Sequence, residues 1–268
     1  MKNPNQVDNN QETIQLAEFY KSFIREKAHS KEYADLMNPI IQKIDEEHVK
    51  YINNSILLWN DYVGGSEALV ELLANILDLG EHSVTSHYKN DKSPAIAKYS
   101  CADKAVRIAF YDGPTSEAPS NQSANKVVEL CRIVAHEMWH GYQYREIEKH
   151  GPRAPIYQDN FENYIRAKED SFQENCAYLK QPVEAEAFVF GDKFAFKFVE
   201  KIISSLEKEQ SEYRGKKAMH AVSDEKSEEE GDYDVFIGDT IYLSDEDMKA
   251  AELTALKKIY NNLGMRVG

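Results

Sequence analysis

The chain has 268 residues, a formal net charge of −14 at pH 7 and a sequence pI of about 5.1, so we expect no surface that binds nucleic-acid phosphates. Its 42% hydrophobic and 11% aromatic content is ordinary for a globular protein and excludes wholesale disorder. There is no run of about 18 apolar residues, no apolar signal segment at the N-terminus and no close spacing of the three cysteines. We therefore expect a soluble, cytoplasmic protein with no membrane contact and no disulfide framework.

Residues 1–85 are expected to form an N-terminal helical region. The first dozen residues are polar, and we expect them to be disordered. Beyond them, apolar residues recur at helical spacing. Pro39 is expected to start or kink a helix, and Gly64 and Gly65 to break the chain before a further helix.

Residues 86–209 change from a strand pattern to a helix pattern. Two apolar stretches, 95–99 and 105–111, are separated by a short polar segment, which is typical of a β-hairpin. Between residues 124 and 149 apolar side chains surround most of a helix, so we expect that helix to be buried. Pro182 stands where a further long helix begins.

Residues 210–268 are expected to form an acidic linker and a C-terminal amphipathic helix. Residues 224–247 contain eleven Asp and Glu against one Lys, so the rest of the chain carries only −4 of the net charge. A short strand is expected at 234–243. Together these patterns predict an α+β, mainly helical fold in which a small β-hairpin or sheet packs on the buried helix.

The buried helix carries the sequence HEMWH at residues 136–140, a match to H-E-x-x-H. Side chains four residues apart lie on one face of a helix, so His136 and His140 can approach the same ion. Neutral imidazole is a common ligand of Zn²⁺. Glu137 can then act as a general base toward a metal-bound water. The alternative is that these are ordinary polar residues on a less buried helix.

A catalytic zinc needs a third protein ligand, and the helix that begins at Pro182 offers two candidates. Glu184 and Glu186 stand about 200° apart around a helix, so only one of them can face the metal. Ala187 lies on nearly the same face as Glu184 and lets two helices approach, whereas Glu186 shares its side with Phe190. We predict Glu184 as the ligand and keep Glu186 as the alternative. Either could instead be a solvated glutamate favoured by the helix dipole.

H-E-x-x-H at residues 136–140, followed by Glu184 44 residues after the second histidine, resembles the zincin metallopeptidases of the gluzincin type. The similarity covers about residues 86–205 and extends loosely to the ImmA/IrrE-like bacterial or mobile-element peptidases. It implies a hairpin-bearing sheet beside the active-site helix and zinc bound by the two histidines and Glu184. It also implies hydrolysis of a protein or peptide substrate, with Glu137 as the general base.

The sequence departs from that family at one position. Many gluzincins place an Asp or Asn four residues after the glutamate ligand, where it orients a histidine, but this chain has Phe188 there. The orienting partner must therefore come from elsewhere or be a backbone carbonyl. A downstream Met-turn signal is lacking as well, which disfavours a metzincin.

Two further features are candidates for roles in the reaction. We expect the strand at 105–111 to be a sheet edge along which an extended substrate lies. The donor that stabilises the oxyanion is left open among five side chains. They are Tyr142, Tyr144, His150, Tyr157 and Tyr178.

The leading hypothesis is thus a zinc-dependent endopeptidase. One alternative is a non-catalytic zincin-fold module that binds or regulates other proteins through its N-terminal helices or its acidic tail. Another is a metal-dependent hydrolase that acts on a non-peptide amide.

Overall fold

The structure, a computed structural model, describes residues 4–57, 62–89, 97–111, 121–168, 171–223 and four positions between 253 and 258. Within these residues the chain is mainly helical and has one small sheet, as expected. Its elements are α1 (Pro4–Ala28), α2 (Lys31–Ile41), α3 (Glu46–Leu57), α4 (Tyr62–Ile76), β1 (Ser83–Lys89), β2 (Ala97–Ser100), β3 (Ala105–Tyr111), α5 (Asn121–Glu148), α6 (Ala154–Glu162), α7 (Phe172–Lys180) and α8 (Pro182–Ser223).

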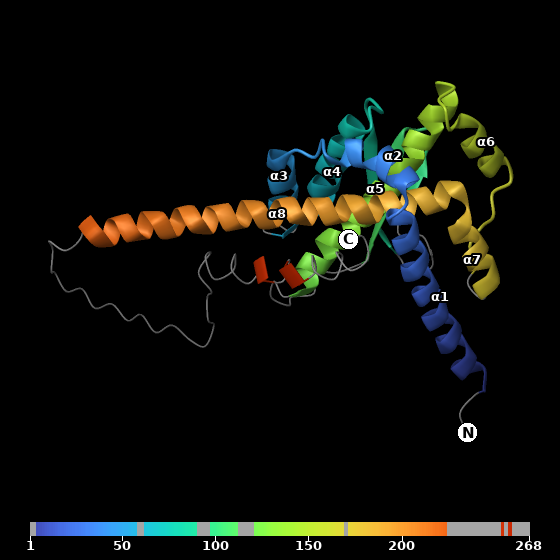
Figure 1. The fold of residues 1–268 in the computed structure, drawn as a ribbon, viewed down its shortest axis with the longest axis horizontal. Coiled ribbons are helices and arrows are strands. Elements are labelled where there is room, and N and C mark those ends of the chain that lie inside the picture. The colour runs from blue at the N-terminus through green and yellow to red at the C-terminus, as the bar shows by residue number, and fades with distance from the viewer. Residues whose placement is uncertain are drawn as a thin grey trace.

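The helices α5 and α8 pack against each other at the centre of the fold, and Figure 1 shows α8 running the length of the molecule. Both helices are rich in buried apolar side chains, which is why the sequence pattern predicted a buried α5. At Gly191 the two backbones approach so closely that a Cβ atom would lie 2.7 Å from the carbonyl oxygen of Arg132. The short distance between α8 and α5 at this point therefore requires a residue without a Cβ atom.

The N-terminal helices share one hydrophobic core with this central pair. The helices α1, α2 and α3 all contact α8, and α4 packs on α5. In Figure 1, α4 lies above α8, whereas α1 extends below it. The core side chains of these helices, such as Met37, Ile52 and Leu73, are fully buried.

The sheet has the strand order β1-β3-β2. The predicted hairpin is confirmed, since β2 pairs antiparallel with β3. The parallel strand β1 was not predicted, because Ser83–Lys89 has a weak apolar pattern. Its presence makes the prediction of a sheet edge at 105–111 wrong: β3 is the central strand, with a hydrogen-bonded neighbour on both sides.

Two expectations for the N-terminal region are also wrong. The predicted disorder of the first dozen residues fails from Pro4 onward, where α1 begins with a proline in a position that needs no N–H donor. Gly64 and Gly65 do not break the chain but lie in the first turn of α4. Gly65 and Ser66 are buried, so packing outweighs their low helix propensity. Pro39, which was expected to start or kink a helix, does not start one, since it lies inside the last turn of α2.

The start of α8 at Pro182 is confirmed, and the helix continues past residue 210 to Ser223. The acidic segment after it and the strand expected at 234–243 lie outside the described residues. The helical state of residues 253, 254, 257 and 258 agrees with the expected last helix. In the described part of the chain, no helix has both the length and the apolar character that crossing a membrane requires.

Candidate metal centre

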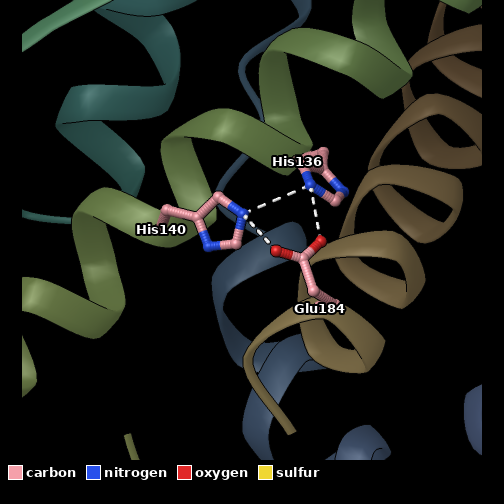
Figure 2. Close-up of side chains that lie close together, drawn as sticks. All are labelled: His136, His140 and Glu184. Carbon is pink, nitrogen blue, oxygen red and sulfur yellow. Dashed lines mark hydrogen bonds and ion pairs between the residues drawn. The ribbon is translucent and has the colours of Figure 1, made fainter. Parts of the chain in front are cut away.

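His136 and His140 of α5 and Glu184 of the first turn of α8 lie together between the two helices (Figure 2). The Nε2 atoms of the two histidines are 3.2 Å apart. Glu184 Oε2 lies 3.4 Å from His136 Nε2, and Oε1 lies 3.6 Å from His140 Nε2. The structure thus brings together the two histidines of the H-E-x-x-H motif and the first of the two candidate glutamates.

The donor atoms of this cluster suit a metal ion. One donor atom from each of the three residues lies within 4.8 Å of the other two, and the Nε2–Nε2 distance of 3.2 Å is close to the edge of about 3.3–3.4 Å of a tetrahedral zinc site. Glu184 is only 1% exposed, and both histidines are largely covered. Two imidazoles and a carboxylate that converge in such a buried place are close enough to bind one ion.

The carboxylate of Glu184 also accepts hydrogen bonds from two tyrosines. Tyr164 donates to Oε1 and Tyr178 donates to Oε2, each at 2.6 Å. Burial alone would raise the pKa of Glu184, but the two histidines and the Tyr164 hydroxyl together lower it to about 2. Burial and the nearby carboxylate raise the pKa of both tyrosines. Glu184 is therefore an anion held by hydrogen-bond donors, and its two tyrosines stay protonated.

Glu137 lies outside the three-residue cluster, on the side of α5 that faces the sheet. Its Oε2 accepts a 2.7 Å hydrogen bond from the backbone N–H of Tyr99, which belongs to β2. The bond ties the carboxylate to the sheet by a main-chain donor, so it does not depend on the side chain at position 99. Glu137 is therefore not one of the three residues whose donor atoms lie close enough to hold one ion.

Glu186, the alternative third ligand, faces away from the histidines. It is fully buried and accepts hydrogen bonds from Tyr157 at 2.6 Å and from the Trp139 indole at 3.3 Å. Arg153 forms an ion pair with its other oxygen and a second ion pair with Glu32 of α2. The carboxylate of Glu186 is therefore already occupied by partners within the chain.

Of the five side chains considered as oxyanion donors, only Tyr178 contacts the cluster. Tyr142 and Tyr144 stack on aromatic neighbours. Tyr157 donates to the second glutamate, and His150 is exposed at the end of α5.

Sequence reasoning missed two residues of the site, Tyr164 and Gln143. Tyr164 lies in the connection between α6 and α7, where no periodic pattern marked any residue. Gln143, three residues after His140 on α5, lies 2.8 Å from the Nδ1 atom of that histidine. Helical spacing carried a signal for Gln143, because residues three apart are neighbours on a helix.

Comparison of the chain with known protein families, with curated proteins and with solved structures found no match. What the site can do therefore follows from its own chemistry. A bound cation, a carboxylate beside it and two hydroxyl donors are the groups that water-dependent hydrolysis uses.

Proposed function

We propose that this chain is a zinc-dependent peptidase of the zincin type, in which His136, His140 and Glu184 hold Zn²⁺. The observation that carries the proposal is the convergence of two imidazoles and one carboxylate, with one donor atom of each residue within 4.8 Å of the other two. When bound, zinc acts as a Lewis acid and lowers the pKa of its water toward neutrality.

Glu137 is the general base of the proposed reaction. Its hydrogen bond to the N–H of Tyr99 engages Oε2 and holds the carboxylate on the side of α5 that faces the sheet, one residue after His136. The carboxylate then accepts the proton of the attacking water and passes it to the amine that leaves.

Tyr164 and Tyr178 are the donors best placed to stabilise the oxygen that becomes negative during attack. Both hydroxyls already lie within 2.6 Å of a carboxylate oxygen of the cluster. Their raised pKa values keep them in the donating form. Each hydroxyl has one proton, which it donates to Glu184 in the free protein, so a tyrosine that stabilises the oxyanion would have to turn its proton from Glu184 toward that oxygen.

The arrangement of the elements supports a zincin core. β2 contacts α5 and supplies the amide that holds Glu137, as expected for a sheet beside the H-E-x-x-H helix. The glutamate ligand comes from the start of a later helix, as in the gluzincin pattern. The substrate class, a protein or peptide, follows from this resemblance.

The proposal is tested by cleavage of a peptide library, followed by mass spectrometry. We expect cleavage that a chelator stops and zinc restores. Glu137→Gln should keep zinc bound and lower the cleavage rate by at least about 100-fold, the lower limit of a general-base contribution. Glu148→Gln, an exposed change on the same helix, is the matched control and should cleave like wild type.

Two results would contradict the proposal. One is cleavage that survives complete removal of the metal. The other is a Glu137→Gln variant that is as active as wild type. Binding of a partner protein that depends on zinc, without cleavage, would favour the non-catalytic alternative.

A further inference from the structure

Gln143 connects the two helices that carry the metal ligands. Its side chain is fully buried between α5 and α8. Its Oε1 lies 2.8 Å from His140 Nδ1, and its Nε2 donates to the backbone carbonyl of Val183 at 2.9 Å. Val183 directly precedes Glu184. One amide group thus contacts a histidine ligand on one helix and the backbone next to the glutamate ligand on the other.

These two contacts fix the orientation of the amide. The carbonyl of Val183 can only accept, so the amide nitrogen of Gln143 must point toward it. The amide oxygen must then point toward His140. Turning the amide over would bring two oxygens together at Val183 and lose the hydrogen bond there.

The orientation of Gln143 in turn determines which nitrogen of His140 carries the proton. An amide oxygen only accepts, so Nδ1 must be the N–H donor of the neutral ring. Nε2 then holds the lone pair, and Nε2 is the atom that faces His136 and Glu184. The protein therefore presents His140 in the form that a metal ion needs, before any ion binds.

His136 provides a comparison within the same site. Its Nδ1 is buried without a hydrogen-bond partner in the described part of the chain. Its ring is instead held by contact with the ring of Phe188, at 4.4 Å between centroids. An effect of Gln143 should therefore be specific to His140.

We propose that Gln143 is a positioning residue, which fixes the proton of His140 on Nδ1 and ties the start of α8 to α5 in the geometry that binds the metal. The inference rests on the metal site of the proposed function but not on its hydrolytic activity. Position 188, where the gluzincin pattern has its orienting residue, lies against His136, so Gln143 supplies a partner for the other histidine.

The test compares two substitutions at one position. Gln143→Met keeps the length of the side chain and removes both hydrogen bonds. Gln143→Glu keeps an acceptor for His140 Nδ1 but removes the donor to Val183. Val127→Ala, a core change nine residues before His136 on α5, is the control for a general loss of stability.

Two quantities are measured in each protein. Nitrogen-15 NMR of the metal-free protein, at a pH where the ring is neutral, reports which nitrogen of His140 is protonated. Competition with a chromophoric chelator reports the zinc affinity. We expect Nδ1–H in wild type, Gln143→Glu and Val127→Ala, and a mixture of forms in Gln143→Met. Zinc affinity should fall by about 10–100-fold in Gln143→Met, by less in Gln143→Glu and hardly at all in Val127→Ala.

The inference is overturned if wild-type His140 carries its proton on Nε2. It is overturned equally if Gln143→Met keeps the wild-type proton position and zinc affinity, or if Val127→Ala weakens zinc binding as much as Gln143→Met. Failure of wild type to bind zinc would instead refute the metal site of the proposed function, so the two failures are distinguishable.

Discussion

Glu184 and Glu186 are two residues apart on α8, and both are almost completely buried, yet their surroundings differ in one respect. Glu186 forms an ion pair with Arg153 and accepts bonds from Tyr157 and the indole of Trp139. Glu184 faces two histidines and two tyrosine hydroxyls, and within the described residues no lysine or arginine pairs with it.

The difference shows how the same residue type can serve structure at one position and ligand binding at the next. A buried carboxylate is costly unless a positive charge or several donors compensate it. Arg153 supplies the positive charge for Glu186. The histidine nitrogens next to Glu184 suit an ion that comes from outside the chain. The first glutamate is thus prepared for a cation, whereas the second holds α6 and α8 together.

The largest expected effect comes from exchanging the two glutamates for glutamine one at a time. Glu184→Gln should lower zinc affinity by more than about 100-fold. Loss of a ligand should cost more than loss of a residue that only orients a ligand, which typically lowers metal affinity by about 10–100-fold. Glu186→Gln should leave zinc affinity close to wild type and lower the free energy of unfolding by about 3 kcal/mol, since Arg153 loses its buried partner. Zinc titration and denaturant unfolding measure the two effects.

This pair of variants is its own control, because each removes one carboxylate from the same helix. If Glu186→Gln weakened zinc binding as much as Glu184→Gln, the division between the two glutamates would be wrong.

The second prediction concerns the pH dependence of the metal-free protein. The pKa of Glu184 lies at about 2, below its ordinary value of 4.5, so its ionised form stabilises the fold above pH 4.5. That contribution, about 3 kcal/mol, should be lost as the pH falls from 4.5 to 2. Burial raises the pKa of Glu186 in spite of its three donors, so its contribution has the opposite sign and declines as the pH rises above 4.5.

Denaturant unfolding across this pH range, in the presence of a chelator, measures both contributions. Compared with wild type, Glu184→Gln should lose less stability below pH 4.5, and Glu186→Gln should lose less above it. If the free energy of unfolding changed with pH in the same way in all three proteins, the two carboxylates would titrate alike and the prediction would be wrong.

The third prediction concerns the contact between the two central helices. A glycine-to-alanine change in a helix normally stabilises it by about 0.5–1 kcal/mol. At Gly191 the new Cβ atom would lie 2.7 Å from the carbonyl oxygen of Arg132. Gly191→Ala should therefore destabilise the protein, by about 2 kcal/mol, and weaken zinc binding as α8 moves away from α5. A variant as stable as wild type would refute this close approach.

The smallest expected effect concerns the hydroxyls that hold Glu184. Tyr164→Phe and Tyr178→Phe should each lower the free energy of unfolding of the metal-free protein by about 1 kcal/mol. Tyr144→Phe is the control, because Tyr144 packs by its ring against Phe161. Equal stability of all three variants in thermal unfolding would contradict the hydrogen bonds to Glu184.

The parts of the site that follow from local helical geometry could be predicted from the sequence. The spacing of His136 and His140 determines that they share a face of α5, and the angle between Glu184 and Glu186 determines that only one faces the histidines. Ala187 indicated which one, and the structure places Glu184 with the histidines.

The parts that depend on contacts between distant segments could not be predicted. Tyr164 reaches Glu184 from a connection without periodicity, and Arg153 reaches Glu186 from the start of α6. The strand β1 pairs with β3 although its own sequence has a weak strand pattern, and this pairing turned the expected edge strand into a central one. In each case a contact with a distant segment determines the structure, and the sequence of the segment itself does not indicate that contact.

Zinc analysis of the purified chain, combined with X-ray absorption at the zinc edge, tests the central claim most directly. We predict one zinc per chain, with two imidazole nitrogens and a carboxylate oxygen among its ligands and no sulfur, and loss of this zinc in Glu184→Gln but not in Glu186→Gln. A wild-type chain that retains no more zinc than Glu184→Gln, or a zinc bound by cysteine sulfur, would contradict the claim.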